Sequence, residues 1–404
     1  MPDPTAEERV RIERPATGGG VGRLGDGRVV FVRDTLPGEL VEVTIEQRTS
    51  SFARASLRRV LEPSADRVAA ACRFSGAGGC GGCDLQHASS SGQTSWKEAV
   101  VAEQLRRVAG YDVAPSLVLP PSPPHGSRTR LRCAVDDKGR LALRASRSHT
   151  LVPVNPCWLV DPRVAEAFTT TWSRAEEVEL RAIGDAAPFA VVKRPAGRSV
   201  RYDVCDLRGH RIDPAPISRV LVSGTHYNVS PQSFWQSHVD APSMLLDRVT
   251  SLAGLQRGDR VVDLYCGVGL FAVALAAFVG PGGRVVGVES SPHAVRDARE
   301  NGTGHSGLRI RQAMVTADAA RNLIGAGDVV VADPPRAGLA KGVAAAIVEQ
   351  RPRRVVYVSC DAATFARDLK VFLSGGFSVS HMEILDLFPM TEHVELVALL
   401  DIHP

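Results

Sequence analysis

The chain lacks a hydrophobic run long enough to cross a membrane. Its longest apolar stretch, Leu270 to Gly280, is far shorter than the roughly 20 residues that a spanning helix needs. The first thirty residues mix charges throughout and contain no apolar core of a signal peptide. We therefore expect a cytoplasmic protein with no membrane partner.

The sequence also lacks internal repeats, low-complexity tracts and a strong charge bias, since its net charge is only +4. A length of 404 residues with 44% hydrophobic content predicts two or three globular domains. Eight cysteines in a cytosolic chain of this size argue against a disulfide framework. The clustered ones are better explained as metal ligands or catalytic groups, above all Cys72, Cys80, Cys83 and Cys157.

Positive charge is concentrated in one stripe that contains only two acids, Asp136 and Asp137. Such a stripe can bind the phosphate backbone of a nucleic acid. A solvated strand face is the alternative explanation, and the stripe alone favours neither. Its members are Arg128, Arg130, Arg132, Lys138, Arg140, Arg144 and Arg147.

Short alternating runs, such as Leu40 to Ile45, and Gly- and Pro-rich turns fill residues 5–63 and predict a small β-barrel. Small barrels of this kind often bind oligonucleotides. Residues 64–225 read as a central α+β domain that carries the cysteines and the basic stripe. There Ser95 to Glu98 resembles a capping box and predicts a helix over 95–108 that ends at Gly110. This helix is a candidate to pack on the C-terminal domain.

Residues 226–404 alternate buried-strand patterns with helical stretches, which predicts an α/β domain with a mostly parallel, doubly wound sheet. In this fold, ligands bind at the carboxyl ends of the strands near the switch point. The predicted strands are Arg260 to Asp263, Arg284 to Glu289, Asp328 to Asp333, Arg354 to Cys360, Phe377 to Ile384, and Val394 to Ile402.

The first strand of this domain runs into a glycine loop with Gly267 and Gly269, followed by a helix. The next strand ends at Glu289, where a ribose hydroxyl pair would lie. A tight turn without a ligand is the alternative. Because the loop has two glycines and no P-loop lysine, S-adenosylmethionine fits it better than a nicotinamide or a nucleoside triphosphate.

Two later segments carry reactive side chains. A strand ends in Asp333, Pro334, Pro335 and Arg336, and another ends in Cys360, whose thiol could attack a bound substrate. The Asp333 carboxylate could instead cap a helix, and the cysteine could be a buried apolar residue. After a Pro-marked bend, Glu395 offers a carboxylate, and a nucleophile with a base is what covalent catalysis needs.

Taken together, these motifs resemble the RNA uracil-C5 methyltransferases, which convert uridine to 5-methyluridine with S-adenosylmethionine. The resemblance covers nearly the whole chain and implies a Rossmann-like class I methyltransferase domain behind an N-terminal TRAM domain. Its carriers are Gly19 to Gly22 with Pro37 to Glu39, Cys80 to His87, Asp333 to Gly338, Ser359 and Cys360 with Ala363 to Leu369, and His393 to Glu395.

The resemblance implies that Cys360 is the nucleophile, Glu395 is the base and the four clustered cysteines hold a [4Fe-4S] cluster. Spacing alone leaves structural zinc as an alternative, because both groups accept four thiolates. It also implies RNA as the partner, with ribosomal RNA favoured over tRNA, and a monomer. An RNA-binding assembly factor with little turnover is the remaining alternative. The implied cofactor contacts are Gln236, Tyr265, Glu289 and Asp333.

The sequence departs from the family pattern at three positions. Leu270 stands where the family often has Asn, which makes Asp318 the candidate for the missing polar contact to the cofactor. His238 also occupies a position that is often Asn. Asp361 follows the nucleophile where Asn is usual. Its carboxylate should oppose thiolate formation unless it points away or pairs with an arginine.

Overall fold

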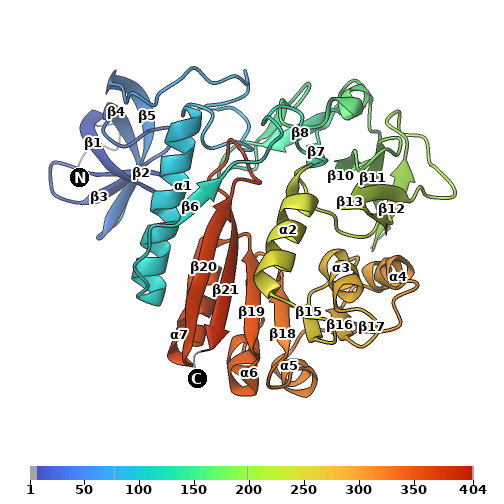
Figure 1. Cartoon of the computed structure of the whole chain (residues 1–404). Coiled ribbons are helices and arrows are strands. Elements are labelled where there is room, and N and C mark those ends of the chain that lie inside the picture. The colour runs from blue at the N-terminus through green and yellow to red at the C-terminus, as the bar shows by residue number, and fades with distance from the viewer. Residues whose placement is uncertain (1–6, 77, 198, 403–404) are drawn as a thin grey trace. The chain divides into compact units, whose positions relative to one another are not determined.

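The computed structural model describes residues 7–76, 78–197 and 199–402, and the chain forms two compact units (Figure 1). The first unit combines the chain up to Glu103 with Ala142–Val154 and Phe388–His393. The second unit contains Gln104–Leu141, Asn155–Leu387 and the chain from Val394 on. Neither unit is a continuous stretch of sequence, and the three domain ranges given above stay a prediction. None of the described helices is long and apolar enough to span a membrane.

A closed five-stranded barrel opens the first unit, as the sequence predicts. Alternate side chains of its strands point inward, so that Val30, Val41 and Val43 are fully buried. Gly19 allows two strands to approach, because a Cβ there would lie 2.5 Å from the Val32 carbonyl oxygen. The strands, in the order β1-β2-β3-β5-β4, are β1 (Glu7–Ala16), β2 (Gly19–Arg23), β3 (Val29–Val32), β5 (Phe52–Glu62) and β4 (Leu40–Arg48).

Helix α1 (Ser90–Gln104) starts five positions before the predicted Ser95. The cap is Ser89, whose Oγ accepts a hydrogen bond from the Gly92 N–H at 3.0 Å. Both Ser89 and Ser91 donate to Asp66, which fixes this end of the helix. The helix continues as a π-helical turn, η1 (Leu105–Ala109), that lies against α7 (Ala362–Ser374) and ends at Gly110 as predicted.

The segment Phe388–His393 belongs to the first unit through hydrogen bonds to residues far earlier in the chain. The backbone N–H groups of Asp84 and Leu85 both donate to the Met390 carbonyl oxygen at 3.0 Å. The fully buried Lys97 donates through Nζ to the Phe388 carbonyl oxygen at 3.0 Å. A buried ammonium group needs such acceptors, because leaving it unpaired is costly. A hairpin of β8 (Leu141–Arg144) and β9 (Leu151–Pro153) lies mostly in this unit.

The second unit contains a smaller antiparallel sheet and a hairpin. The sheet order β12-β11-β10-β7 joins neighbours that are mostly adjacent in sequence. A 3-10 helix, η2 (Pro162–Phe168), and the hairpin of β13 (Ser218–Val222) and β14 (Thr225–Val229) complete this part. The sheet strands are β12 (Ser199–Cys205), β11 (Phe189–Ala196), β10 (Glu177–Arg181) and β7 (Arg130–Val135).

An eight-stranded sheet forms the rest of this unit, in the order β17-β16-β15-β18-β19-β21-β20-β6. The five strands from β17 to β19 are parallel, whereas β21 is antiparallel to both of its neighbours. This confirms the predicted Rossmann-like α/β fold. The strands are β6 (Ser116–Val118), β15 (Arg260–Leu264), β16 (Arg284–Glu289), β17 (Leu308–Gln312), β18 (Val329–Ala332), β19 (Arg354–Ser359), β20 (Phe377–Leu385) and β21 (Glu395–Ile402).

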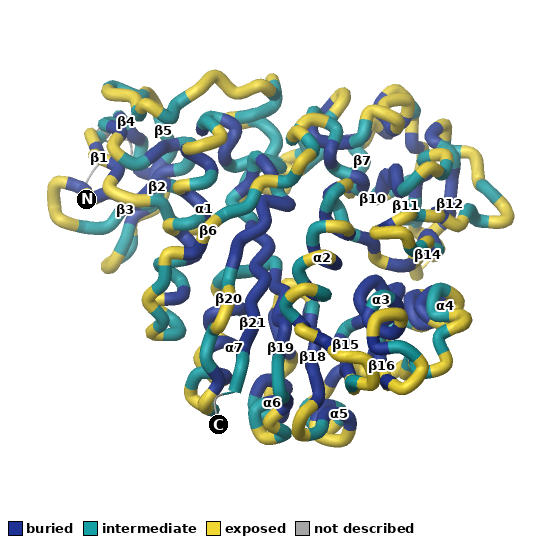
Figure 2. Tube along the Cα trace, viewed as in Figure 1, coloured by how far each residue is buried: buried dark blue, intermediate teal, exposed yellow. Residues whose placement is uncertain are grey.

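Figure 2 shows that the central strands of this sheet are buried, as expected for parallel strands with helices on both faces. The chain winds from β15 towards β17 and then returns to start again at β18. The switch point therefore lies between β15 and β18, where ligands are expected. The helices are α2 (Ala241–Ala253), α3 (Leu270–Val279), α4 (Pro292–Asn301), α5 (Ala317–Leu323), α6 (Val343–Gln350) and α7.

Candidate active site

Four side chains that could take part in binding or catalysis lie at the ends of strands on either side of the switch point. Three of them were predicted from the sequence, and Asp263 was not. Asp263 is the last but one residue of β15, and Glu289 ends β16. Asp333 directly follows β18, and Cys360 directly follows β19. Because these strands are parallel, their carboxyl ends lie at one edge of the sheet. The fold thus gathers at one edge residues that lie far apart in the sequence.

Glu395 reaches the same edge from the opposite chain direction. It is the first residue of β21, which runs antiparallel to β19 and pairs Leu396 with Ser359. Burial raises the pKa of the Cys360 thiol to about 12, and the nearby charges of Glu395 and Asp333 add to this effect. The thiol and both carboxyl groups therefore lie close together, with Glu395 only 4% exposed.

Three buried acids at this edge have raised pKa values. Burial raises the pKa of Asp333 to about 7. It also raises the pKa values of Asp263 and Glu395 well above their ordinary range, and the charge of Asp333 contributes to both shifts. A cation bound nearby would favour the ionised forms of these carboxyl groups, so this edge suits a cationic ligand. A sulfonium group, as in S-adenosylmethionine, has that charge.

Asp263 is the site residue that the sequence analysis missed. Its side chain is fully buried, and neither carboxylate oxygen makes a well-formed hydrogen bond within the described residues, although the Ala272 N–H lies near enough to lower its pKa slightly. Buried polar groups in native proteins are normally paired, so an orphaned carboxylate at a strand end indicates a place for a ligand. Its position at the end of the strand before the glycine loop is the signal that could have identified it.

The glycine loop has the backbone shape that a cofactor needs for close approach. Gly267 and Gly269 have φ values of +54° and +90°, and a Cβ on Gly267 would meet only open space. The Gly267 N–H donates to Glu289 Oε2 at 3.1 Å, which ties the loop to the end of β16. Tyr265 has a φ of +64°, which is strained for a residue with a side chain. These residues fit the predicted cofactor site.

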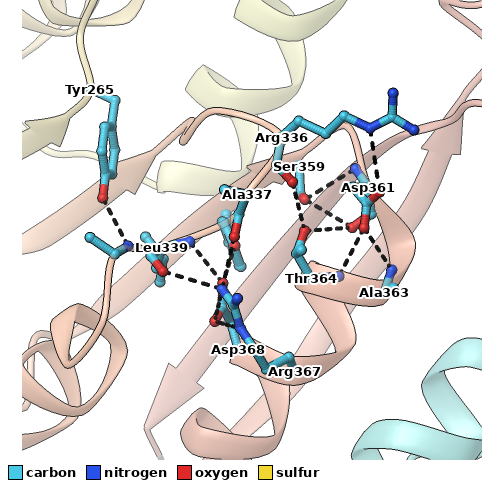
Figure 3. A network of polar contacts seen from close by, with 12 residues as sticks. Tyr265, Arg336, Ala337, Leu339, Ser359, Asp361, Ala363, Thr364, Arg367 and Asp368 are labelled. Atoms are coloured by element: carbon cyan, nitrogen blue, oxygen red, sulfur yellow. Dashed lines mark hydrogen bonds and ion pairs between the residues drawn. The ribbon is translucent and has the colours of Figure 1, made fainter.

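Helix α7 holds the loop that follows Asp333, as Figure 3 shows. Thr364 Oγ1 donates to the Arg336 carbonyl oxygen at 3.2 Å, and the Leu339 N–H donates to Asp368 Oδ2 at 2.9 Å. Tyr265 Oη accepts from the Ala340 N–H at 3.3 Å, which joins this loop to the glycine loop. The segment after Asp333 is therefore held in place by α7 and by the glycine loop.

Comparison with known proteins agrees with this geometry. The chain is 39% identical to an uncharacterized RNA methyltransferase of Streptomyces coelicolor, over 98% of this chain and 93% of that protein. It is 32% identical to the 23S rRNA (uracil(1939)-C(5))-methyltransferase of Acinetobacter baylyi, over 93% of this chain and 89% of that protein. The chain belongs to the RNA uracil-C5 methyltransferase family.

Family models and a solved structure agree with this membership. The model of the tRNA (uracil-5-)-methyltransferases matches residues 325–402, the TRAM domain model matches residues 5–57, and the model of protein-L-isoaspartate(D-aspartate) O-methyltransferase matches residues 218–319. The tRNA (uracil-54, C5)-methyltransferase of Pyrococcus abyssi, solved with S-adenosyl-L-homocysteine, superposes with a TM-score of 0.70 at 25% identity, covering 97% of this chain and 99% of that one. The chain is thus an RNA methyltransferase with a TRAM domain.

The departure of this methyltransferase at Asp361 is balanced locally. The Asp361 carboxylate caps α7, accepting from the N–H groups of Ala363 at 3.1 Å and Thr364 at 2.9 Å. Its other oxygen lies 3.6 Å from Arg336 Nε. The charge of Arg336 lowers the pKa of the Cys360 thiol, whereas that of Asp361 raises it. The arginine therefore offsets the acid that the family pattern lacks.

Two charge-removing substitutions should shift the reactivity of Cys360 in opposite directions. Arg336→Gln removes a positive charge, so it should raise the pKa of Cys360 and move the alkylation profile to higher pH. Asp361→Asn keeps the helix cap but removes a negative charge, so it should move the profile to lower pH. Each should change the iodoacetamide alkylation rate at a fixed pH by roughly threefold or more. Shifts in one common direction would contradict this assignment.

Two other predicted cofactor residues, Gln236 and Asp318, lie outside the group of buried acids. Gln236 is in the loop between β14 and α2, and its carbonyl oxygen accepts from Thr129 Oγ1 at 2.9 Å. Asp318, in the first turn of α5, has an 87% exposed side chain paired with Arg321. Asp318 is therefore not among the buried acids of the site. The cofactor contacts of both residues stay predictions.

Three of the four clustered cysteines lie in the first unit, and Cys157 lies in the second. The Gln86 side chain links two of them, since its Oε1 accepts from the Cys72 N–H at 3.1 Å and its Nε2 lies 3.4 Å from Cys83 Sγ. All four are partly exposed, and four thiolates are the donor set that an iron-sulfur cluster or zinc requires. Across residues 7–76, 78–197 and 199–402, however, no three such side chains are arranged to hold a metal ion.

The predicted basic stripe does not act as one surface. Arg130 and Arg132 both bind Glu179, at 2.7 and 3.0 Å. Although burial opposes its ionisation, the arginines around Glu179 hold the pKa of that carboxyl at about 2. Arg140 likewise binds Asp136 at 2.8 Å. This part of the stripe is neutralised within the protein, whereas Arg144 and Arg147 belong to the other unit.

Proposed function

We propose that this methyltransferase methylates C5 of a uridine in ribosomal RNA, with Cys360 as the nucleophile and Glu395 as the base. The observation that carries the proposal is the meeting of the Cys360 thiol with the carboxyl groups of Glu395 and Asp333 at the switch-point edge of the sheet. Covalent catalysis needs a nucleophile and a base within reach of the same substrate atoms. We expect a monomer, because one chain supplies both.

The chemistry of uracil explains why a thiol is needed. Uracil C5 is a poor nucleophile, but addition of the Cys360 thiolate at C6 turns the ring into an enolate that carries electron density at C5. S-adenosylmethionine supplies the electrophilic methyl group that C5 then attacks. Glu395 removes the C5 proton, the C5–C6 double bond forms again and the Cys360 thiolate leaves. The raised pKa of Glu395 makes it a strong base once it is ionised.

The cofactor would be held by the buried acids, the glycine loop and the loop that follows Asp333. Gly267 and Gly269 allow close backbone approach, Glu289 would accept hydrogen bonds from the ribose, and Asp333 with Asp263 would face positive charge. Gln236 and Tyr265 would complete the site. A uridine stacked within RNA must first be turned out, which costs a few kcal/mol that the RNA-binding parts of the chain help to offset.

For the cysteines we propose a [4Fe-4S] cluster on Cys72, Cys80, Cys83 and Cys157, with zinc as the alternative. The C-x-x-C bite and the Gln86 contact to Cys83 support a four-thiolate site. A structural or RNA-positioning role suits these residues, since none of them belongs to the catalytic edge of the sheet. Measuring the iron, sulfide and zinc contents of anaerobically purified protein distinguishes the two groups.

The substrate proposal is tested by incubating anaerobically purified protein with methyl-labelled S-adenosylmethionine and either unmodified ribosomal RNA or unmodified tRNA. We expect label in 5-methyluridine from ribosomal RNA, detected by nucleoside mass spectrometry. The Acinetobacter baylyi relative, at 32% identity, is named for 23S rRNA, whereas the solved structure at 25% identity is named for tRNA. Label in tRNA alone would establish the alternative substrate. Bound cofactor without label in either RNA would overturn the proposal in favour of an assembly factor.

A further inference from the structure

The first unit contains a groove of about 670 Å³ whose lining includes none of the proposed catalytic or cofactor-binding residues. Four segments of this unit line it: the end of β3, the segment after Cys80, the turn between β8 and β9, and the segment Phe388–His393. None of the eight cysteines lines it. Its volume is typical of pockets that enclose a ligand larger than a single ion. The wall contains the charged residues Arg33, Asp84, Arg144, Arg147 and Glu392, together with His149 and His393.

The groove has more positive charge than its own acids can neutralise. Arg33 binds Asp84 at 2.9 Å. In the described part of the chain, however, the Arg144 guanidinium has no hydrogen-bond or ion-pair partner. Arg147 donates only to the Gly18 carbonyl oxygen, at 3.3 Å. Two of the three arginines therefore lack a carboxylate partner, unlike Arg130 and Arg132 in the other unit.

Crowding of like charges supports this interpretation. Burial lowers the pKa of Arg147, repulsion from Arg33 and Arg54 lowers it further, and attraction by the charges of Glu392 and Glu46 offsets this only in part. Burial also raises the pKa of Glu392, whose Oε2 accepts from the Gly18 N–H at 2.5 Å. Glu392 therefore takes up a proton more readily than an ordinary glutamate, whereas the arginines stay cationic. An anionic ligand would relieve the repulsion among them.

The groove is preformed by close backbone contacts. The Gly81 N–H donates to the Arg144 carbonyl oxygen at 2.8 Å. A Cβ at Gly81 would lie 2.8 Å from the Ser146 Cα, so glycine is needed for this approach. These contacts fix the turn that presents Arg144 and Arg147. Such a rigid wall lowers the entropic cost of binding a ligand.

We propose that this groove binds the phosphodiester backbone of the substrate RNA. The proposal rests on the function proposed above, which supplies RNA as the ligand. Three guanidinium groups without enough carboxylates suit phosphate oxygens, because arginine forms paired, charge-assisted hydrogen bonds with them. Of the predicted basic stripe, Arg144 and Arg147 belong to this site. Arg130 and Arg132 do not, because they are paired with Glu179 within the protein.

The test measures RNA affinity against salt concentration, together with kcat and KM for methyl transfer to unmodified ribosomal RNA. The variants are Arg144→Gln, Arg147→Gln and the double variant. Each lost phosphate contact should reduce the slope of log affinity against log salt by about 0.7 for single-stranded RNA. We expect the double variant to raise KM for RNA about tenfold, and much more than it lowers kcat.

The control is Arg59→Gln, because the Arg59 side chain is 67% exposed, binds Glu42 at 3.3 Å and does not line the groove. It should keep the affinity and the salt slope of the parent. Arg144→Gln is the variant least able to disturb folding, since its guanidinium has no partner among the described residues. Equal thermal unfolding midpoints would confirm that each variant is folded.

If the folded double variant has the RNA affinity and the salt slope of the parent, the proposal is overturned. The groove would then be assigned to a protein or a small anionic ligand. Weaker RNA binding by the groove variants supports it, even where the parent forms no 5-methyluridine. That second outcome would refute the proposed methylation and keep the RNA site. The RNA-binding measurement therefore tests the groove, and the formation of 5-methyluridine tests the proposed function, so the two can fail independently.

Discussion

Replacing Cys360 with alanine is expected to lower methyl transfer to RNA by at least about 10⁴-fold, while S-adenosylmethionine still binds. Without the thiolate, nothing adds to uracil C6, and C5 stays too poor a nucleophile to take the methyl group. The cofactor contacts come from other strand ends, so binding should persist. Single-turnover incorporation of labelled methyl groups measures the first effect, and calorimetric titration of the cofactor measures the second.

A matched cysteine is available as the control. Cys133 lies in β7, is fully buried and is outside the catalytic edge. Cys133→Ala removes one buried sulfur at a modest cost in stability, and it should keep the methylation rate of the parent. If Cys360→Ala retained more than about 1% of the activity, a loss of less than about 3 kcal/mol in transition-state stabilisation, the covalent route would be wrong.

Replacing Glu395 with glutamine should trap the enzyme on its substrate. The thiolate addition and the methyl transfer need no base at C5, so both should still occur. The C5 proton then stays in place, and the thiolate cannot leave. We expect the rate of product release to fall by about 10²- to 10⁴-fold. A protein–RNA adduct should appear on denaturing gels, and label from the cofactor should migrate with it.

Two further variants make this result specific. The double variant Cys360→Ala with Glu395→Gln should form no adduct, because the attacking sulfur is gone. Glu349→Gln changes an exposed acid of α6 that lies outside the catalytic edge and the groove, and it should form product without accumulating adduct. If Glu395→Gln released product at the rate of the parent, another group would have to serve as the base.

Sequence patterns predicted the barrel and the large sheet because burial there follows simple periods. In β4, alternate residues such as Val41 and Val43 point into the core, and β18 is buried throughout. The edge strand β17 escaped prediction because Arg309 and Arg311 are exposed and interrupt the apolar pattern. The start of α1 was wrong because Ser89 caps it through contacts with Asp66, a residue far outside the local motif.

The site could be predicted where a reactive residue ends an apolar strand, as with Asp333 and Cys360. The balance between Asp361 and Arg336 could not, since it depends on how α7 holds a loop from another part of the chain. Nor could pairing within the basic stripe be foreseen. Arg130 binds Glu179, which lies 49 residues away and reaches it only through strand pairing.

The discontinuous first unit has a consequence for the order in which the protein is made. Chains emerging from the ribosome generally fold N-terminal parts first. Here Lys97 finds one of its acceptors at Phe388, 291 residues later. The barrel can close early, but its unit stays incomplete until the segment Phe388–His393 has been synthesised. Glu395 follows within a few residues, so the proposed base reaches its strand at the same stage of synthesis.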